Sequence, residues 1–231
     1  MEHTENTAVG CVIMASGRAE RFGSNKLLDD FGGAPLIVRA LDAAETPALA
    51  ARVVVTRSPE VAELACKAGV RTILHSLPGR NDTVRLGLEA LLSELPGLAG
   101  CIFLPGDQPL LRKESLEAMV RDLSALDEKE RAILRLGFRA EDGTERLGSP
   151  VLFGSSYFDA VLPARGQGRR RGHPPASGVC AGGICGTAGR AGGCRYRRRA
   201  GAAARTFVNT FPQKKPPRQQ LQAARRGGVL Q

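Results

Sequence analysis

The sequence predicts an α/β domain in which a mainly parallel sheet is covered by helices on both faces. Two observations favour this fold class. Short apolar runs alternate with longer stretches whose apolar residues recur at helical spacing, which is typical of repeated βαβ units. The runs themselves are almost continuously apolar, as expected for strands buried on both faces of a parallel sheet. We therefore expect a Rossmann-like three-layer sandwich.

The first elements follow one another without a break in the pattern. A buried strand is predicted at residues 8–14, and the helix after it ends near Pro47. The second strand covers residues 52–56. Ser58-Pro59-Glu60 then begins a helix, because serine caps helices well and proline fits their first turn.

The same alternation continues through the next hundred residues. Strands are predicted at 70–74 and 100–104, and the helix between them can be capped by Asn81-Asp82. A further helix spans 113–126. Ligands of such sheets lie beyond the carboxyl ends of the strands. The segments after the first and fourth strands are therefore the first candidates for function.

One domain, residues 8–162, accounts for this pattern, with an N-terminal tail at 1–7 and an irregular basic segment at 163–231. The last segment holds 15 Lys and Arg and no Asp or Glu, whereas the residues before it carry a net charge of −5. Such a composition indicates disorder. An RNA-binding tail is the alternative, but aromatic residues are scarce, so we do not expect nucleic acid as a partner.

Composition also bears on location and on structural metals. No run of about 18 apolar residues is present, and the first seven residues are polar and acidic, so we expect a cytoplasmic protein that does not enter the membrane. The six cysteines show no paired CxxC spacing. Reduced thiols are expected rather than a structural zinc site.

The segment Ala15–Lys26 follows the first strand and combines glycines with basic side chains. Glycine lets backbone N–H groups approach an anion, while guanidinium and ammonium groups bind phosphate oxygens. The segment matches neither a Walker A loop nor a GxGxxG fingerprint. The residues of this segment are therefore suited to binding a polyphosphate.

The spacing GxxxRFGxxK in this segment resembles the signature of the MobA-like NTP transferase family, which includes molybdenum cofactor cytidylyltransferase and the related guanylyltransferase. The resemblance covers residues 8 to about 162. It implies that the segment binds the nucleotide and that Arg18 and Lys26 stabilise the departing pyrophosphate. The nucleotide-binding residues implied here are Ala15, Ser16, Gly17, Arg18, Arg21, Phe22, Gly23 and Lys26. Ser16 stands where the family more often has alanine, a small-for-small change that we expect to be tolerated.

A second match to the family is Gly106-Asp107-Gln108-Pro109-Leu110-Leu111, after the fourth strand. A carboxylate in a rigid turn suits Mg²⁺, which prefers oxygen ligands and completes its shell with water and phosphate oxygens. The resemblance implies that Gly106 and Asp107 contact the nucleotide and that Asp107 is a catalytic metal ligand. Mg²⁺ is therefore the expected cofactor.

The segment Pro78–Leu88 begins a helix whose free N–H groups suit an anion or a base edge. A well-capped helix without a ligand is the alternative. The segment resembles the part of the family that contacts base and ribose, which adds Asn81 and Thr83 to the nucleotide site. Its likeness to the RxxSV turn of other cytidylyltransferases favours CTP. Leu147–Phe153 resembles a family strand that borders the acceptor.

The resemblance implies transfer of CMP from CTP to a phosphorylated acceptor, with molybdopterin as the preferred acceptor and the molybdoenzyme that receives the cofactor as a further partner. Guanylyl transfer to the same cofactor and cytidylyl transfer to a sugar or polyol phosphate are alternatives. A non-catalytic nucleotide-binding protein is a third. No role is assigned to His3, His75 or His173.

The resemblance ends near Leu162, and we interpret the segment after it as the product of a reading-frame error in a GC-rich gene. Starting one nucleotide later in each codon, Gln167-Gly168-Arg169 can be read as Lys-Gly-Gly. In the same frame Cys194-Arg195-Tyr196-Arg197 can be read as Ala-Asp-Ile-Asp, and Gly201-Ala202 as Glu-Leu. The family has comparable residues there, including a second metal motif. A chain without that motif should have little or no activity.

This interpretation predicts the coding DNA. The codons of Arg195 and Arg197 should both carry adenine in the third position, because only then does the shifted frame encode Asp-Ile-Asp. Sequencing the gene around these codons and around Leu162 measures this directly. Any other base at either third position would rule the hidden motif out.

Overall fold

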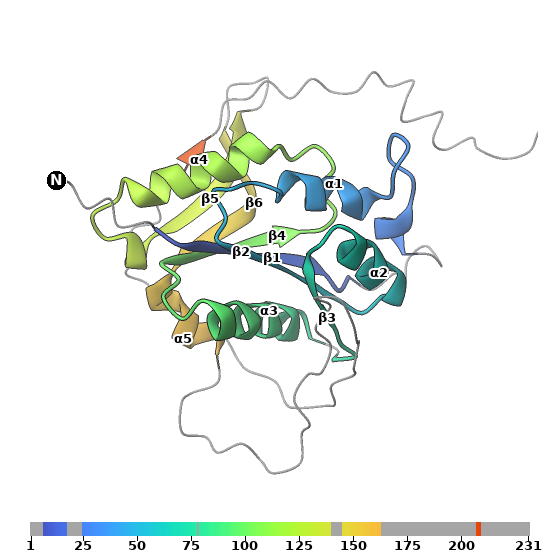
Figure 1. Ribbon diagram of the computed structural model, residues 1–231. Coiled ribbons are helices and arrows are strands. Elements are labelled where there is room, and N and C mark those ends of the chain that lie inside the picture. The colour runs from blue at the N-terminus through green and yellow to red at the C-terminus, as the bar shows by residue number, and fades with distance from the viewer. Residues whose placement is uncertain (1–6, 18–24, 78, 140–144, 163–206, 209–231) are drawn as a thin grey trace, which may run out of the picture.

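The computed structural model describes residues 7–17, 25–77, 79–139, 145–162 and 207–208 (Figure 1). Three layers are visible, with a twisted sheet between two layers of helices. The expected α/β sandwich is confirmed.

The sheet has the strand order β3-β2-β1-β4-β6-β5-β7. β1 lies between β2 and β4, and the four strands from β3 to β4 are parallel. β6 runs antiparallel to both of its neighbours, β4 and β5. The strands are β1 Val9–Ala15, β2 Ala51–Thr56, β3 Arg71–Leu74, β4 Gly100–Pro105, β5 Ile133–Arg139, β6 Glu145–Gly154 and β7 Phe207–Val208. The sheet is thus mainly parallel at the predicted strands, while β5 was not expected.

The helices cover both faces of this sheet. α3 (Arg80–Glu94) and α5 (Phe158–Val161) pack on one face, below the sheet in Figure 1. The other face carries α1 (Leu36–Ala43), α2 (Pro59–Lys67) and α4 (Lys113–Ser124). Buried side chains of alternate strand residues point into two separate apolar clusters, one per face. Burial on both faces explains the continuous apolar runs in the sequence.

Two sequence expectations need correction. β7 pairs in parallel with Leu136 and Gly137 of β5, so Phe207–Val208 is not irregular as predicted. The rest of 163–231 lies outside the described residues. At α3, Gly79 is the capping residue rather than Asn81, because the Asp82 carboxylate reaches back and accepts a hydrogen bond from the Gly79 N–H at 3.1 Å.

The cysteines and the helices agree with two expectations drawn from composition, which are reduced buried thiols and no membrane-spanning segment. Cys11 and Cys101 are fully buried in neighbouring strands, and burial raises the pKa of the Cys11 thiol to about 12. Both are therefore uncharged at neutral pH. Over the described ranges, every helix is too short or too polar to span a membrane.

Gly87 lets α3 approach β1 more closely than any side chain allows. A Cβ added at Gly87 would lie 2.4 Å from Cγ1 of Val12 and 2.8 Å from its Cγ2. Val12 is fully buried and its branched side chain is stiff, so it cannot move aside. The contact sets how closely the middle of α3 packs against the middle of β1.

Gly87→Ala should destabilise the protein by about 1–2 kcal/mol, because overpacking outweighs the gain in helix propensity. Urea unfolding of the full chain measures this. Gly97→Ala is the matched control, since its added Cβ meets no atom within 4 Å, and it should change stability by less than about 0.5 kcal/mol. Equal stability of both variants would show that Val12 does not restrain α3.

Candidate functional site

The candidate site lies at the carboxyl ends of β1 and β4. The chain leaves β1 toward β2 and β3 on one side, and β4 lies on the other, so the chain direction switches between these two strands. Ligands of open α/β sheets bind at such a switch point. The backbone N–H of Gly106, after β4, donates to the carbonyl of Met14 in β1 at 3.0 Å. A Cβ at Gly106 would meet Ile37 at 2.8 Å, so glycine keeps this turn against β1.

Lys26 and Asp107 meet at this edge although 80 residues separate them in the chain. The Lys26 ammonium donates to Oδ2 of Asp107. Lys26 lies at the start of a 3₁₀ helix, Lys26–Leu28, whose first turn is capped by the Asn25 side chain. Both charged side chains stay accessible, with 57% and 38% of their surface exposed. An ion pair this exposed contributes at most about 1 kcal/mol, so it opens easily when other charges arrive.

Asp107 fits a metal ion that is shared with a bound polyphosphate. Among the described residues, no group of three or more His, Cys, Asp or Glu side chains is arranged to hold a metal. Mg²⁺ does not need such a cage, because one or two carboxylates, water and phosphate oxygens suffice. A single exposed carboxylate beside a lysine is consistent with that mode of binding.

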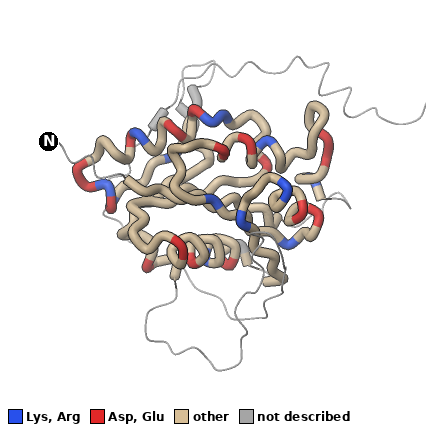
Figure 2. Tube along the Cα trace, in the orientation of Figure 1, with Lys and Arg blue, Asp and Glu red and all other residues tan. Residues whose placement is uncertain are grey.

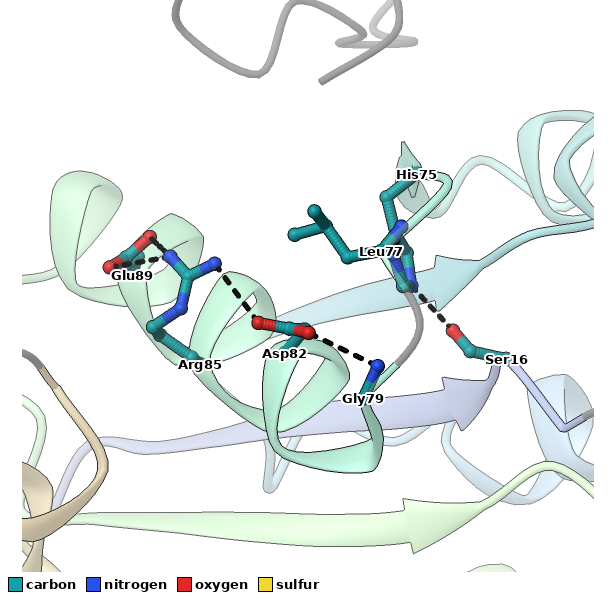
Figure 3. A network of polar contacts seen from close by, with 7 residues as sticks. All are labelled: Ser16, His75, Leu77, Gly79, Asp82, Arg85 and Glu89. Carbon is teal, nitrogen blue, oxygen red and sulfur yellow. Dashed lines mark hydrogen bonds and ion pairs between the residues drawn. The ribbon is translucent and has the colours of Figure 1, made fainter. Parts of the chain in front are cut away.

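Ser16, the residue directly after β1, is half-buried and takes part in a polar network with His75 (Figure 3). Its hydroxyl donates to the Val55 carbonyl at 3.0 Å and lies 2.8 Å from Nε2 of His75. On the other side of the ring, Nδ1 of His75 accepts from the Leu77 N–H at 3.2 Å. Because Nδ1 is an acceptor, the ring proton lies on Nε2 and is donated to Ser16.

His75 is uncharged at neutral pH. It is 3% exposed, and burial lowers the pKa of its imidazole to about 4, with the nearby guanidinium of Arg57 acting in the same direction. Asp82 opposes this shift and Arg85 adds to it. Arg85 is itself paired with Glu89 at 3.0 Å and with Asp82 at 3.5 Å (Figure 3).

The first turn of α3 presents both an exposed and a buried polar residue. Asn81 is exposed, whereas Thr83 is only 2% exposed. The Thr83 hydroxyl has no hydrogen-bond partner among the described residues. An unsatisfied buried hydroxyl costs about 1–3 kcal/mol, and a ligand that bonds it would recover that energy.

The structure brings together part of the predicted site. Ala15 is buried at the end of β1, and Ser16 and the exposed Gly17 follow it at the same edge as Gly106, Asp107 and Lys26. Arg18, Arg21, Phe22 and Gly23 lie outside the described residues.

His75 and Arg57 follow β3 and β2 at this edge of the sheet. The sequence analysis assigned no role to His75 and did not single out Arg57, since neither residue stands in a motif.

Charge is not concentrated on one side of the described part of the chain. In the view of Figure 2, acidic and basic residues are interspersed along the trace.

Comparison with known proteins identifies the domain. The family profile described as the MobA-like NTP transferase domain matches residues 11–174. A "Probable molybdenum cofactor guanylyltransferase" of Pyrococcus horikoshii is 27% identical over 112 residues, which cover 48% of this chain and 55% of that protein. A 3-deoxy-manno-octulosonate cytidylyltransferase of Polynucleobacter asymbioticus is 30% identical over 108 residues, 45% of this chain and 42% of that protein. The chain spans about half the length of these curated relatives.

Solved structures share the fold at low sequence identity. A 4-diphosphocytidyl-2C-methyl-D-erythritol synthase of Anaerococcus prevotii has a TM-score of 0.54 and 14% identity, covering 68% of this chain and 75% of that one. A nucleotidyl transferase of Methanothermobacter has a TM-score of 0.52 and 20% identity, covering 67% and 75%. The profile match spans most of the chain, so the chain belongs to the MobA-like NTP transferase family.

Proposed function

We propose that this chain carries a nucleotidyltransferase site that transfers a nucleoside monophosphate from a nucleoside triphosphate to a phosphorylated acceptor, releasing pyrophosphate. The observation that carries the proposal is the meeting of Lys26 and Asp107 at the switch point between β1 and β4. Family membership supports the reaction class.

Lys26 and the segment 15–26 bind the triphosphate in this proposal. The reaction is an in-line attack of an acceptor phosphate oxygen on the α-phosphorus, with pyrophosphate as the leaving group. The bond from the α-phosphorus to the bridging oxygen breaks, and that oxygen leaves with the negative charge. Lys26, with Arg18 and Arg21, stabilises this charge. The acceptor phosphate is already anionic, so no side-chain nucleophile is needed.

Asp107 exchanges its partner when the nucleotide binds. In the free protein its carboxylate accepts from Lys26, and both groups are exposed. With nucleotide bound, Lys26 contacts the phosphates in this proposal, and Asp107 would then hold Mg²⁺. Such an ion would supply charge stabilisation for the triphosphate.

The nucleotide we propose is CTP, bound with its base and ribose against the first turn of α3. Thr83 offers a buried hydroxyl that lacks a partner among the described residues, and Asn81 is exposed on the same turn. Ribose and base edges provide partners for such groups. GTP is the alternative, and the curated relatives include both a guanylyltransferase and a cytidylyltransferase.

Molybdopterin is the acceptor we propose first, and the molybdoenzyme that receives the cofactor is the next partner. A sugar or polyol phosphate is the second candidate acceptor, and the curated relatives include cytidylyltransferases named for a sugar acid, 3-deoxy-manno-octulosonate. If residues 163–231 come from a shifted frame, the chain retains nucleotide binding but little turnover, since a second metal carboxylate is missing.

Lys26→Met and Asp107→Asn should separate the two roles. Lys26→Met should weaken CTP binding about tenfold or more with or without Mg²⁺, because it removes the cation that meets the phosphates. Asp107→Asn should abolish the tightening that Mg²⁺ gives to the unchanged protein. Calorimetric titration with CTP and GTP measures binding, and pyrophosphate release with and without molybdopterin measures turnover.

Lys67→Met is the matched control, since Lys67 forms a similarly exposed ion pair with Glu63 at 2.7 Å, away from the site. All three variants should unfold within about 1 kcal/mol of the unchanged protein, because exposed pairs add little stability. A well-folded chain that binds neither CTP nor GTP would refute the proposed function.

Thr83→Val should leave the free protein as stable or stabilise it slightly, because valine keeps the shape and removes an unpartnered hydroxyl. The same change should weaken CTP binding about tenfold, since the bound nucleotide loses a partner. Thermal unfolding and calorimetry measure the two effects.

The control is Thr46→Val. Thr46 is also buried, but its hydroxyl donates to Glu117 at 2.7 Å, so its loss should destabilise the fold and spare nucleotide binding. Destabilisation by Thr83→Val with unchanged CTP affinity would show that the Thr83 hydroxyl serves the fold alone.

A further inference from the structure

We propose that His75 is a positioning residue for the phosphate-binding segment, acting through the hydroxyl of Ser16. The inference rests on the proposed function of residues 15–26. His75 does not reach the reacting atoms in this proposal. It fixes the point at which β1 ends and the binding segment begins.

The network joins the carboxyl ends of three neighbouring parallel strands. His75 follows β3, Val55 belongs to β2 and Ser16 follows β1. The backbone N–H of His75 also donates to the Thr56 carbonyl at 3.0 Å, which fixes the base of its side chain. Hydrogen bonds therefore link the residues at the carboxyl ends of β3, β2 and β1.

Only one arrangement of protons satisfies every group in this network. The Leu77 N–H donates to Nδ1, the Nε2 proton is donated to Ser16 Oγ, and the Ser16 hydroxyl donates to the Val55 carbonyl. Protonating Nδ1 would set its N–H against the Leu77 N–H, and turning the ring over would place carbon atoms where the two nitrogens now make their hydrogen bonds. The neutral ring is therefore held in one orientation, and Ser16 with it.

This restraint matters because Ser16 immediately precedes Gly17, the first glycine of the segment. Small displacements of groups that bind a substrate reduce its reactivity strongly. The charged groups that act on the His75 ring are Arg57, the residue directly after β2, and Asp82 and Arg85 on α3. Since the ring itself stays neutral, it adds no charge of its own to compete for phosphate.

The strand end itself does not depend on this network. The Thr56 hydroxyl donates to the Ala15 carbonyl at 3.1 Å, inside the fully buried part of the sheet. β1 is also paired with β2 along its length. Variants at His75 or Ser16 should therefore fold, with the effect confined to the residues after Ala15.

Two substitutions of His75 separate its two nitrogens. In His75→Asn the amide oxygen can take the place of Nδ1 and accept from Leu77, but the side chain is too short for Ser16. In His75→Gln the terminal amide can take the place of Nε2 and donate to Ser16, but the acceptor for Leu77 is lost. Ser16→Ala removes the hydroxyl that bonds Nε2 of His75, so it breaks the same contact from the serine.

The affinities for CTP and CMP, and the backbone amide order parameter of Gly17 by NMR, are the readouts in the full chain. His75→Asn and Ser16→Ala should each weaken CTP binding about tenfold and CMP binding less than about twofold, because only the triphosphate relies on the segment. Both should lower the Gly17 order parameter. The double variant should be no worse than either single one, and His75→Gln should retain most of the CTP affinity.

Thr72→Val is the matched control. Thr72 is fully buried in β3 and its hydroxyl donates only within that strand region, to the Val70 carbonyl at 3.0 Å. Thr72→Val should lower the stability of the protein without changing the ratio of its CTP and CMP affinities or the order parameter of Gly17. If His75→Gln is impaired and His75→Asn is not, or if Ser16→Ala behaves like the unchanged protein, the inference is wrong.

The NMR measurement tests the positioning role of His75 independently of nucleotide binding. If the unchanged protein is folded yet binds no nucleotide, the proposed function fails, whereas Gly17 mobility in the same variants still decides whether His75 positions the segment. An order parameter unchanged in both His75→Asn and Ser16→Ala would overturn the positioning role even where CTP affinity falls.

Discussion

The parallel pairing of β1 with β2 and β4 is the constraint on which the rest of the structure depends. A strand in this position has both edges paired and both faces covered, so it must be apolar throughout, as Val9–Ala15 is. Parallel neighbours also end at the same edge of the sheet. The segments after β1 and β4 therefore meet there, and this meeting brings Lys26 to Asp107.

Packing around β1 then sets how closely other groups approach its end. Gly87 allows α3 to lie against Val12, and Gly106 allows the turn after β4 to bond the Met14 carbonyl. A side chain at Gly87 would collide with both methyl groups of Val12. In the proposed function, the Thr83 hydroxyl, which has no partner among the described residues, and the exposed pair of Lys26 and Asp107 are the groups offered to the ligand.

Polar contacts restrain the site differently on its two sides. Toward β4, the charged pair is exposed and weak, so it can rearrange when nucleotide arrives. Toward β2 and β3, the contact of His75 with Leu77 is buried and those of Ser16 are part-buried, so they are more restrained than the exposed pair. A nucleotide site benefits from both properties, because the binding segment needs a fixed origin while its charges must exchange partners.

The sequence alone was sufficient for the fold class and for the order of the first four strands along the chain, because apolar periodicity is a property of short segments. It also singled out Lys26 and Asp107 as separate motif residues, whereas their contact is visible only in the structure. It did not reveal β5, the antiparallel course of β6 or the pairing of Phe207–Val208, since partners far apart in the chain leave no local pattern. Asn81-Asp82 was expected to cap α3, yet Gly79 is the capping residue and the Asp82 carboxylate bonds back to its N–H. The hydrogen bonds of His75 to Ser16 and Leu77 likewise depend on where strand ends lie across the sheet, so only the tertiary structure shows contacts for a histidine to which the sequence assigned no role.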